Sequence, residues 1–111
     1  MMNIRESIKR ILQEETDIPI RLRRRLLFID DMVPFKIKHY YKPNTICRYE
    51  SDEEFFEEVM YSVIDTMYWD YFGDIPDNSN EWTNMFYIME KYIRGNYGDK
   101  LKEYYHINCG N

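Results

Sequence analysis

The chain has two histidines and two cysteines, and they fall into two pairs. His39 precedes Cys47 by eight positions, and His106 precedes Cys109 by three. Neutral imidazole and thiolate are natural zinc ligands, so a fold that brought the two pairs together would form a tetrahedral site. The eight-position separation of His39 and Cys47 is wider than the close Cys-x2-Cys pairs of common zinc modules. The sequence therefore favours ordinary histidines with reduced thiols, places a zinc site second, and ranks a Cys47–Cys109 disulfide last.

A cluster of four arginines is the clearest binding signal in the chain. It consists of Arg21, Arg23, Arg24 and Arg25. On a helix, Arg21, Arg24 and Arg25 share one face and leave the leucines of the segment to face a core. Guanidinium groups pair bidentately with carboxylate or phosphate, so this face suits an acidic protein partner or a nucleic acid. The alternative is a solvated face that balances acidic residues of the same chain.

The charge of the chain is unevenly distributed. Residues 1–48 have eleven basic and six acidic residues, a net charge of +5, and residues 49–111 have four basic and fourteen acidic residues, a net charge of −10. The two halves can attract each other within one fold, or copies of the chain can associate head to tail. The overall charge of −5 opposes nucleic-acid binding, which is therefore the second function considered.

No arrangement of residues in the chain is typical of an enzyme. No serine stands in a nucleophile-elbow motif, and the four glycines are scattered rather than grouped in a phosphate-binding loop. We therefore expect a protein without catalytic activity and, zinc apart, without a cofactor.

The length of 111 residues, with 44% hydrophobic and 32% charged residues, predicts one globular domain spanning residues 1–111. The longest apolar run is residues 85–89, far short of the roughly 20 residues that a membrane span needs. No signal peptide is visible at the start of the chain. We expect a cytoplasmic protein that is neither secreted nor transmembrane.

Apolar residues recur at helical spacing along most of the chain, which predicts an all-α fold, a small orthogonal bundle of five to six helices. The first helix is expected over residues 1–16. Its narrow apolar stripe consists of Ile4, Ile8, Ile11 and Leu12. A stripe this narrow suits docking on a larger body, which is either the rest of this domain or a protein partner.

Local signals predict where the next helices begin and end. Asp17 and Pro19 mark a second start, and Asp30, Asp31 and Pro34 are expected to break that helix and begin a third. Residues 33–37 also alternate as a strand does, but no neighbouring segment offers a strand partner, so a helix is favoured. Residues 42–44 end it.

The best-supported helix begins with a capping box. Ser51 is followed three positions later by Glu54, and the apolar rhythm then continues to Gly73. This helix is apolar around most of its circumference, which is typical of a central, buried element.

Two more helices complete the prediction. Ser79 or Asn80 caps a helix that is expected to end at Gly95, and a short last helix covers residues 99–105. The inner stripe of the longer one is expected to consist of Trp82, Met85, Phe86, Met89 and Ile93.

Residues 2–15, with the sequence MNIRESIKRILQEE, are similar to the start of many short, uncharacterised proteins of large tailed bacteriophages. The triplet Leu12-Gln13-Glu14 also resembles the Leu/Ile-x-Glu cleavage signal of prohead proteases, although Glu15 follows it where that signal has a small residue. The resemblance implies a phage origin, a location in the cytoplasm of the host cell or in the virion, and a leading helix that acts as a removable tag for binding a scaffold.

Together these features predict a small phage-encoded structural or interaction protein. It is expected to bind a protein partner through the N-terminal stripe and the arginine face, with association between copies as a further form of the same idea. The alternatives are a nucleic-acid-binding protein that uses residues 21–25 and a helical domain held by zinc.

Overall fold

The computed structural model describes residues 18–110, which contain five α-helices, one π-helical turn and no strand. The elements are α2 (Ile20–Arg25), α3 (Phe28–His39), α4 (Pro43–Ile46), α5 (Asp52–Met67), η1 (Tyr68–Phe72) and α6 (Asn80–Cys109). The predicted all-α bundle is confirmed. The helix expected over residues 1–16, with its stripe of Ile4, Ile8, Ile11 and Leu12, lies outside the described residues.

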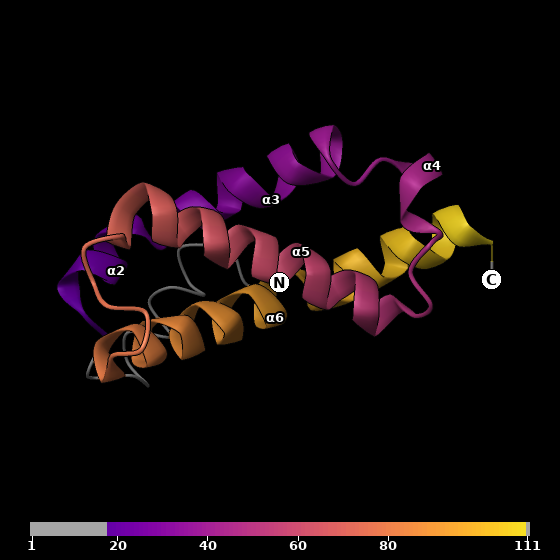
Figure 1. Ribbon diagram of the computed structural model, residues 1–111. Helices are drawn as coiled ribbons and strands as arrows, with labels where there is room; N and C mark the ends of the chain where they lie inside the picture. Colours follow the sequence, from indigo (N-terminus) through magenta and orange to yellow (C-terminus); the bar gives the residue numbers. More distant parts are fainter. Residues whose placement is uncertain (1–17, 111) are drawn as a thin grey trace.

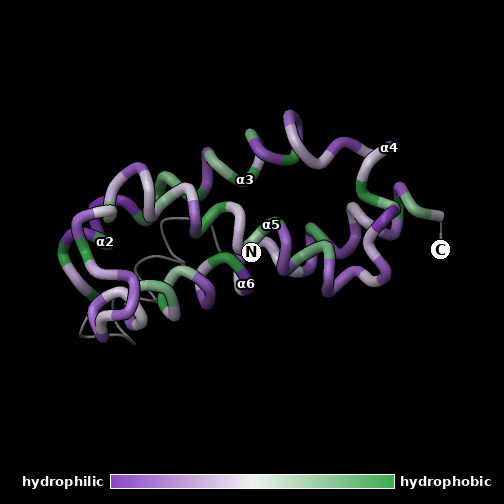
Figure 2. Tube along the Cα trace, in the orientation of Figure 1, coloured by the Kyte–Doolittle hydropathy of each residue, from purple (hydrophilic) through white to green (hydrophobic). Residues whose placement is uncertain are grey.

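Helices α3, α5 and α6 make up most of the described part of the molecule (Figure 1). Helix α6 returns past α5 in the opposite direction, and α3 lies along the other side of α5. The short helix α4 contacts α6 near its C-terminal end, and α2 lies at the other end of the bundle. Hydrophobic and hydrophilic residues alternate along the turns of these helices, as expected where each buries one side (Figure 2).

Helix α5 is the centre of the hydrophobic core, as its sequence predicts. Its buried residues are Phe55, Phe56, Val59, Met60, Val63, Ile64 and Met67. Burying one such side chain contributes about 1.5–3 kcal/mol, so this helix supplies a large part of the driving force for folding. Leu22 and Leu26 from the arginine-rich segment are also buried, which confirms that its leucines face inward.

The boundary between the second and third helices differs from the prediction. The break falls at Leu26 and Leu27, and Asp30 and Asp31 lie in the first turn of α3 instead of ending a helix. Acidic residues are favourable there because the helix dipole is positive at its N-terminus. Pro34 lies inside α3. A proline cannot donate the backbone hydrogen bond expected at this position. Packing of the neighbouring buried residues, such as Val33, in the core keeps the helix continuous without it.

The prediction that a helix ends at Gly95 is wrong, because α6 continues through Gly95 and Gly98 to Cys109. The only described residue with a positive φ is Gly110, at 76°, which caps α6 in the left-handed conformation. Glycine costs about 1 kcal/mol inside a helix. Burial of side chains before and after the two glycines, such as Ile93 and Leu101, outweighs that cost.

Side-chain caps begin α5 and α6. The Ser51 hydroxyl accepts a hydrogen bond from the Glu54 N–H (3.1 Å), and the Ser79 hydroxyl accepts one from the Trp82 N–H (3.1 Å). The Glu54 carboxylate accepts the N–H of Glu50 (2.9 Å), one residue earlier than in a standard capping box. Both predicted caps are therefore confirmed.

Replacing Ser51 with alanine is expected to lower the free energy of unfolding by about 1 kcal/mol, because the Glu54 N–H loses its acceptor. Urea denaturation followed by circular dichroism measures this change. Ser51→Thr keeps the hydroxyl and should retain most of the stability. Equal losses in both variants would contradict a capping role.

Candidate functional site

The four residues considered for zinc do not form one site. Cys47 and Cys109 are joined in a disulfide, with their Cα atoms 5.3 Å apart. Within residues 18–110, no group of three His, Cys, Asp or Glu side chains is placed to hold a metal ion. The order of preference drawn from the sequence is thus reversed, because the disulfide that ranked last is the pairing that the fold makes.

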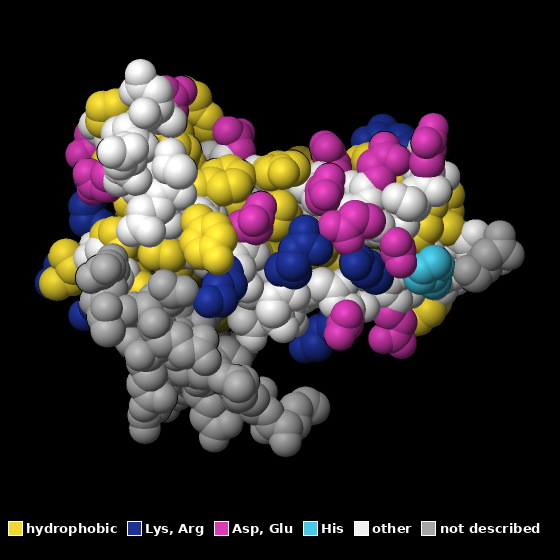
Figure 3. Space-filling model, turned by 90° about the horizontal axis from the view of Figure 1, so that it is seen from below, with side chains coloured by type: hydrophobic (Ala, Val, Ile, Leu, Met, Phe, Trp, Pro, Cys, Tyr) yellow, Lys and Arg dark blue, Asp and Glu magenta, His cyan; other side chains and the backbone are white. Residues whose placement is uncertain are grey.

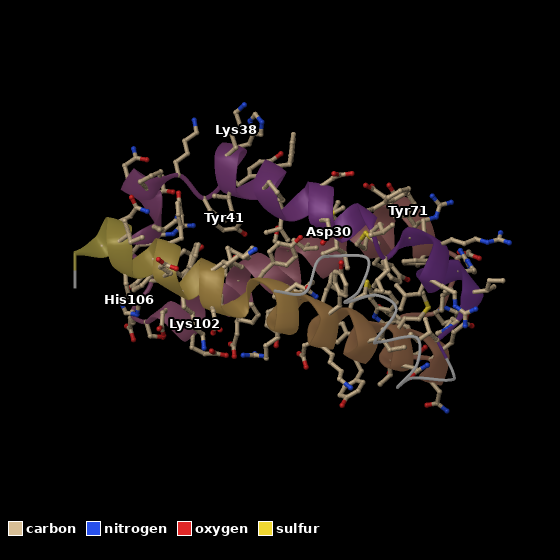
Figure 4. The ribbon with its side chains drawn as sticks, turned by 180° about the vertical axis from the view of Figure 1, so that it is seen from behind. Asp30, Lys38, Tyr41, Tyr71, Lys102 and His106 are labelled. Atoms are coloured by element: carbon tan, nitrogen blue, oxygen red, sulfur yellow. A yellow bond between two sulfur atoms is a disulfide. The ribbon has the colours of Figure 1, made fainter. Side chains whose placement is uncertain are left out.

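The two histidines have separate surroundings. His39, at the end of α3, packs on the ring of Phe35 with the centroids 4.4 Å apart. His106, on α6, has its Nε2 atom 2.8 Å from a carboxylate oxygen of Asp52. Figure 4 shows His106 near the end of α6, on the same helix as Lys102. The pairing of His106 with Asp52 holds the pKa of that carboxyl below its usual range.

Two of the four clustered arginines contact other residues of the same chain. Arg21 donates two hydrogen bonds to the Asp74 carboxylate (3.0 and 2.8 Å) and a third to the Tyr71 carbonyl (2.9 Å). The guanidinium of Arg25 lies 4.4 Å from the centroid of the Tyr71 ring. These contacts join α2 to η1 and the turn after it, so the basic half of the chain meets the acidic half at this point.

The other two arginines make fewer contacts. Arg23 donates to the Ile18 carbonyl (3.3 Å), and exposed Arg24 has no partner among residues 18–110. The cluster therefore does not present four free guanidinium groups to a phosphate backbone.

Acidic and basic side chains also pair within the second half of the chain. Glu53 on α5 lies 3.0 Å from Arg94 and 2.7 Å from Lys102, both on α6. Figure 3 shows acidic and basic side chains interleaved over one face of the molecule. The hydrogen bond from Lys102, followed by that from Arg94, holds the pKa of Glu53 below its usual range. These two ion pairs join α5 to α6 across this face.

A groove of about 590 Å³ opens beside α5, η1 and the start of α6. Aromatic rings and carboxylates make up most of its wall. It is lined by Tyr41, Glu58, Tyr61, Ser62, Ile64, Asp65, Tyr68, Trp69, Asp77, Trp82 and Phe86. We call this the aromatic–acidic groove, and it is the strongest candidate site in the described part of the chain.

The rings of the aromatic–acidic groove hold one another in place. Tyr68 donates its hydroxyl to the Ile75 carbonyl (2.8 Å), and its ring meets Trp82 edge to face with the centroids 4.6 Å apart. On the other side, the centroids of Tyr61 and Phe86 are 6.0 Å apart. Because these rings are held before any ligand arrives, little conformational entropy is lost on binding.

Trp69 stands out on the rim of the groove. Its side chain is 71% exposed, although tryptophan is one of the largest apolar residues. It lies in η1, and π-helical turns are frequent at functional sites. An exposed tryptophan beside fixed aromatic rings is typical of a surface that contacts a partner.

The electrostatic character of the groove is negative. Glu58, Asp65 and Asp77 line it, and none of the described lining residues is basic. Lys36 on α3 is largely buried and interacts with Asp65, so it offsets part of the charge on that side. Burial lowers the pKa of Lys36, and the carboxylates of Asp65 and Asp70 oppose that shift.

The groove could not be recognised in the sequence. Trp82 and Phe86 were expected in the inner stripe of their helix, and both are only partly buried. Tyr61, Asp65 and Trp69 follow one another at intervals of four, so they share one face of the helical segment. That spacing is visible in the sequence, but only the arrangement of α5, η1 and α6 shows that the face borders a groove.

A second polar cluster links α3 to α6. Asp30 accepts hydrogen bonds from the Tyr92 hydroxyl (2.8 Å to the nearer oxygen) and from the Tyr97 hydroxyl. Figure 4 shows Asp30 in the middle of the molecule, where these helices face each other. Burial raises the pKa of both tyrosines, and the hydrogen bonds to Asp30 add to the shift. The cluster satisfies buried polar groups and ties the two helices together.

No protein-family model, no curated protein and no solved structure matches this chain. None of the helices described within residues 18–110 combines the length and the apolar character that crossing a membrane requires.

Proposed function

We propose that this chain is an interaction protein that binds a basic segment of a protein partner in the aromatic–acidic groove. One observation carries the proposal: an open groove combines six aromatic rings with three carboxylates, and none of its described lining residues is basic.

Both parts of the groove favour a cationic side chain. A guanidinium or ammonium group over an aromatic ring gains about 0.5–2 kcal/mol from the electron-rich face of the ring. The carboxylates of Glu58 and Asp77 add attraction and speed up association with a basic partner. The same combination already operates within the molecule, where Arg25 lies over the Tyr71 ring and Arg21 binds Asp74.

The binding residues predicted from the sequence form a separate part of this proposal. The stripe of Ile4, Ile8, Ile11 and Leu12 and the exposed guanidinium of Arg24 would extend the contact with a protein partner beyond the groove. Residues 2–15 also support a phage origin as part of this proposal. Mass spectrometry of purified phage virions tests it, because a virion protein would be detected there.

Binding of a fluorescent Gly-Arg-Gly-Arg-Gly peptide, followed by anisotropy at low and high salt, tests the groove. We expect saturable binding that weakens with salt, and weaker binding of the matched Gly-Gln-Gly-Gln-Gly peptide. Trp69→Ala should lower the affinity for the arginine peptide about tenfold, because the exposed ring supplies a cation–π contact of about 1.4 kcal/mol.

Tyr87→Ala is the matched control. Tyr87 is 57% exposed on α6 but does not line the groove, so its loss should leave the affinity unchanged. Equal affinity for the two peptides, or equal effects of the two substitutions, would contradict the proposal.

A further inference from the structure

The Cys47–Cys109 disulfide lies at an accessible edge of the molecule. Cys47 is exposed and Cys109 is half-buried. A hollow of about 340 Å³ adjoins Cys109 and is lined by Glu50, Ser51, Asp52, Tyr105, His106 and Cys109 itself. An external thiol can therefore approach the sulfur atoms without any unfolding of the chain.

Contacts other than the disulfide hold α4 against α6. The Tyr104 hydroxyl donates to the Tyr41 carbonyl (3.0 Å) before α4, and the Tyr105 hydroxyl donates to the Tyr49 carbonyl (2.6 Å) after it. Ile46, within α4, is fully buried. These contacts on both sides of Cys47 keep the two cysteines near each other when the bond between them is absent.

His106 is placed to assist breakage of the bond. It lies one helical turn before Cys109 on α6, and both residues line the same hollow. The hydrogen bond to Asp52 holds the imidazole ring in place. In its protonated form, an imidazole beside a cysteine stabilises the thiolate.

We propose that the Cys47–Cys109 pair is a thiol–disulfide exchange site in the folded protein, which a dithiol opens as reductant and a small disulfide re-forms as oxidant. A thiolate of the dithiol attacks the exposed Cys47 sulfur and forms a mixed disulfide. The bond between Cys47 and Cys109 breaks, and its electron pair leaves on Cys109 as a thiolate beside His106.

The second thiolate of the dithiol then completes the reduction. It attacks the dithiol sulfur of the mixed disulfide, which yields the cyclic oxidised dithiol and releases Cys47 as a thiolate. The two protons of the dithiol end on the two cysteines, so the protein is reduced by two electrons. The Cys47 sulfur lies 3.5 Å from the Asn108 carbonyl oxygen, where the resulting thiol can donate a hydrogen bond. This site is independent of the aromatic–acidic groove.

Reduction of the full chain by dithiothreitol, with alkylation of free thiols and mass spectrometry at timed intervals, tests the proposal. We expect complete reduction without denaturant, an unchanged helical circular dichroism spectrum, and recovery of the disulfide with oxidised glutathione. A rate that rises in step with unfolding as urea is added, or loss of the helical spectrum on reduction, would overturn it.

Substitution of the two histidines tests the part assigned to His106. His106→Gln should slow the reduction about threefold, because the leaving thiolate loses the imidazole one helical turn away on α6. His39→Gln is the matched control and should leave the rate unchanged, since His39 packs on Phe35 and does not line the hollow. Equal rates in the two variants would overturn the role of His106.

Discussion

Replacing Phe55 with alanine is expected to lower the free energy of unfolding by about 3–5 kcal/mol. Phe55 is fully buried on α5. The centroid of its ring lies about 6 Å from the ring centroids of four tyrosines, Tyr41, Tyr49, Tyr104 and Tyr105. Removing it leaves a cavity where the segments before and after α4 and the end of α6 all meet α5. The tyrosines around it cannot fill that space, since three of their hydroxyls donate to backbone carbonyls.

Chemical denaturation of the purified protein measures this loss. Phe35→Ala is the matched control, because Phe35 is 53% exposed on α3 and should cost less than about 1 kcal/mol. Similar losses in the two variants would contradict the placement of Phe55 at the centre of the core.

Stability is expected to fall steeply above pH 10 because of the buried tyrosines beside Asp30. Burial first, and the hydrogen bond to the Asp30 carboxylate second, raise the pKa of Tyr92 above that of a tyrosine in the unfolded chain. The unfolded chain releases this proton from about pH 10 upward, while the folded chain keeps it. The contribution of Tyr92 is thus fully present below pH 10 and is lost, by about 1.4 kcal/mol per pH unit, as the pH rises toward the folded pKa.

Urea unfolding at pH 8, 10 and 12 tests this expectation. Between pH 10 and pH 12 the original chain should lose more stability than Tyr92→Phe, which has no proton to release at that position. Tyr87→Phe removes an exposed hydroxyl from the same helix and should follow the original chain. Parallel pH dependence of the original chain and Tyr92→Phe would show that the buried hydroxyl does not control alkaline unfolding.

The elements that depend on local chemistry could be predicted from the sequence alone. The apolar rhythm after Ser51 identifies α5 as the central helix, because a segment that is apolar on nearly all sides must be buried. Ser51 and Ser79 identify two helix starts, because their hydroxyls satisfy backbone N–H groups only a few residues away. The inward-facing leucines of the arginine-rich segment follow from helical spacing in the same way.

The features that depend on contacts distant in sequence were decided by the tertiary structure. Gly95 was predicted to end a helix, but α6 continues past it to Cys109. Burial of Ile93 and Leu101 outweighs the intrinsic cost of a glycine inside a helix. Spacing could not show which histidine or cysteine meets which partner. Cys47 and Cys109 are 62 positions apart and come together only because α4 packs on the end of α6. The aromatic–acidic groove likewise exists only where η1 and the start of α6 meet one face of α5, so its residues gain a shared role from the fold.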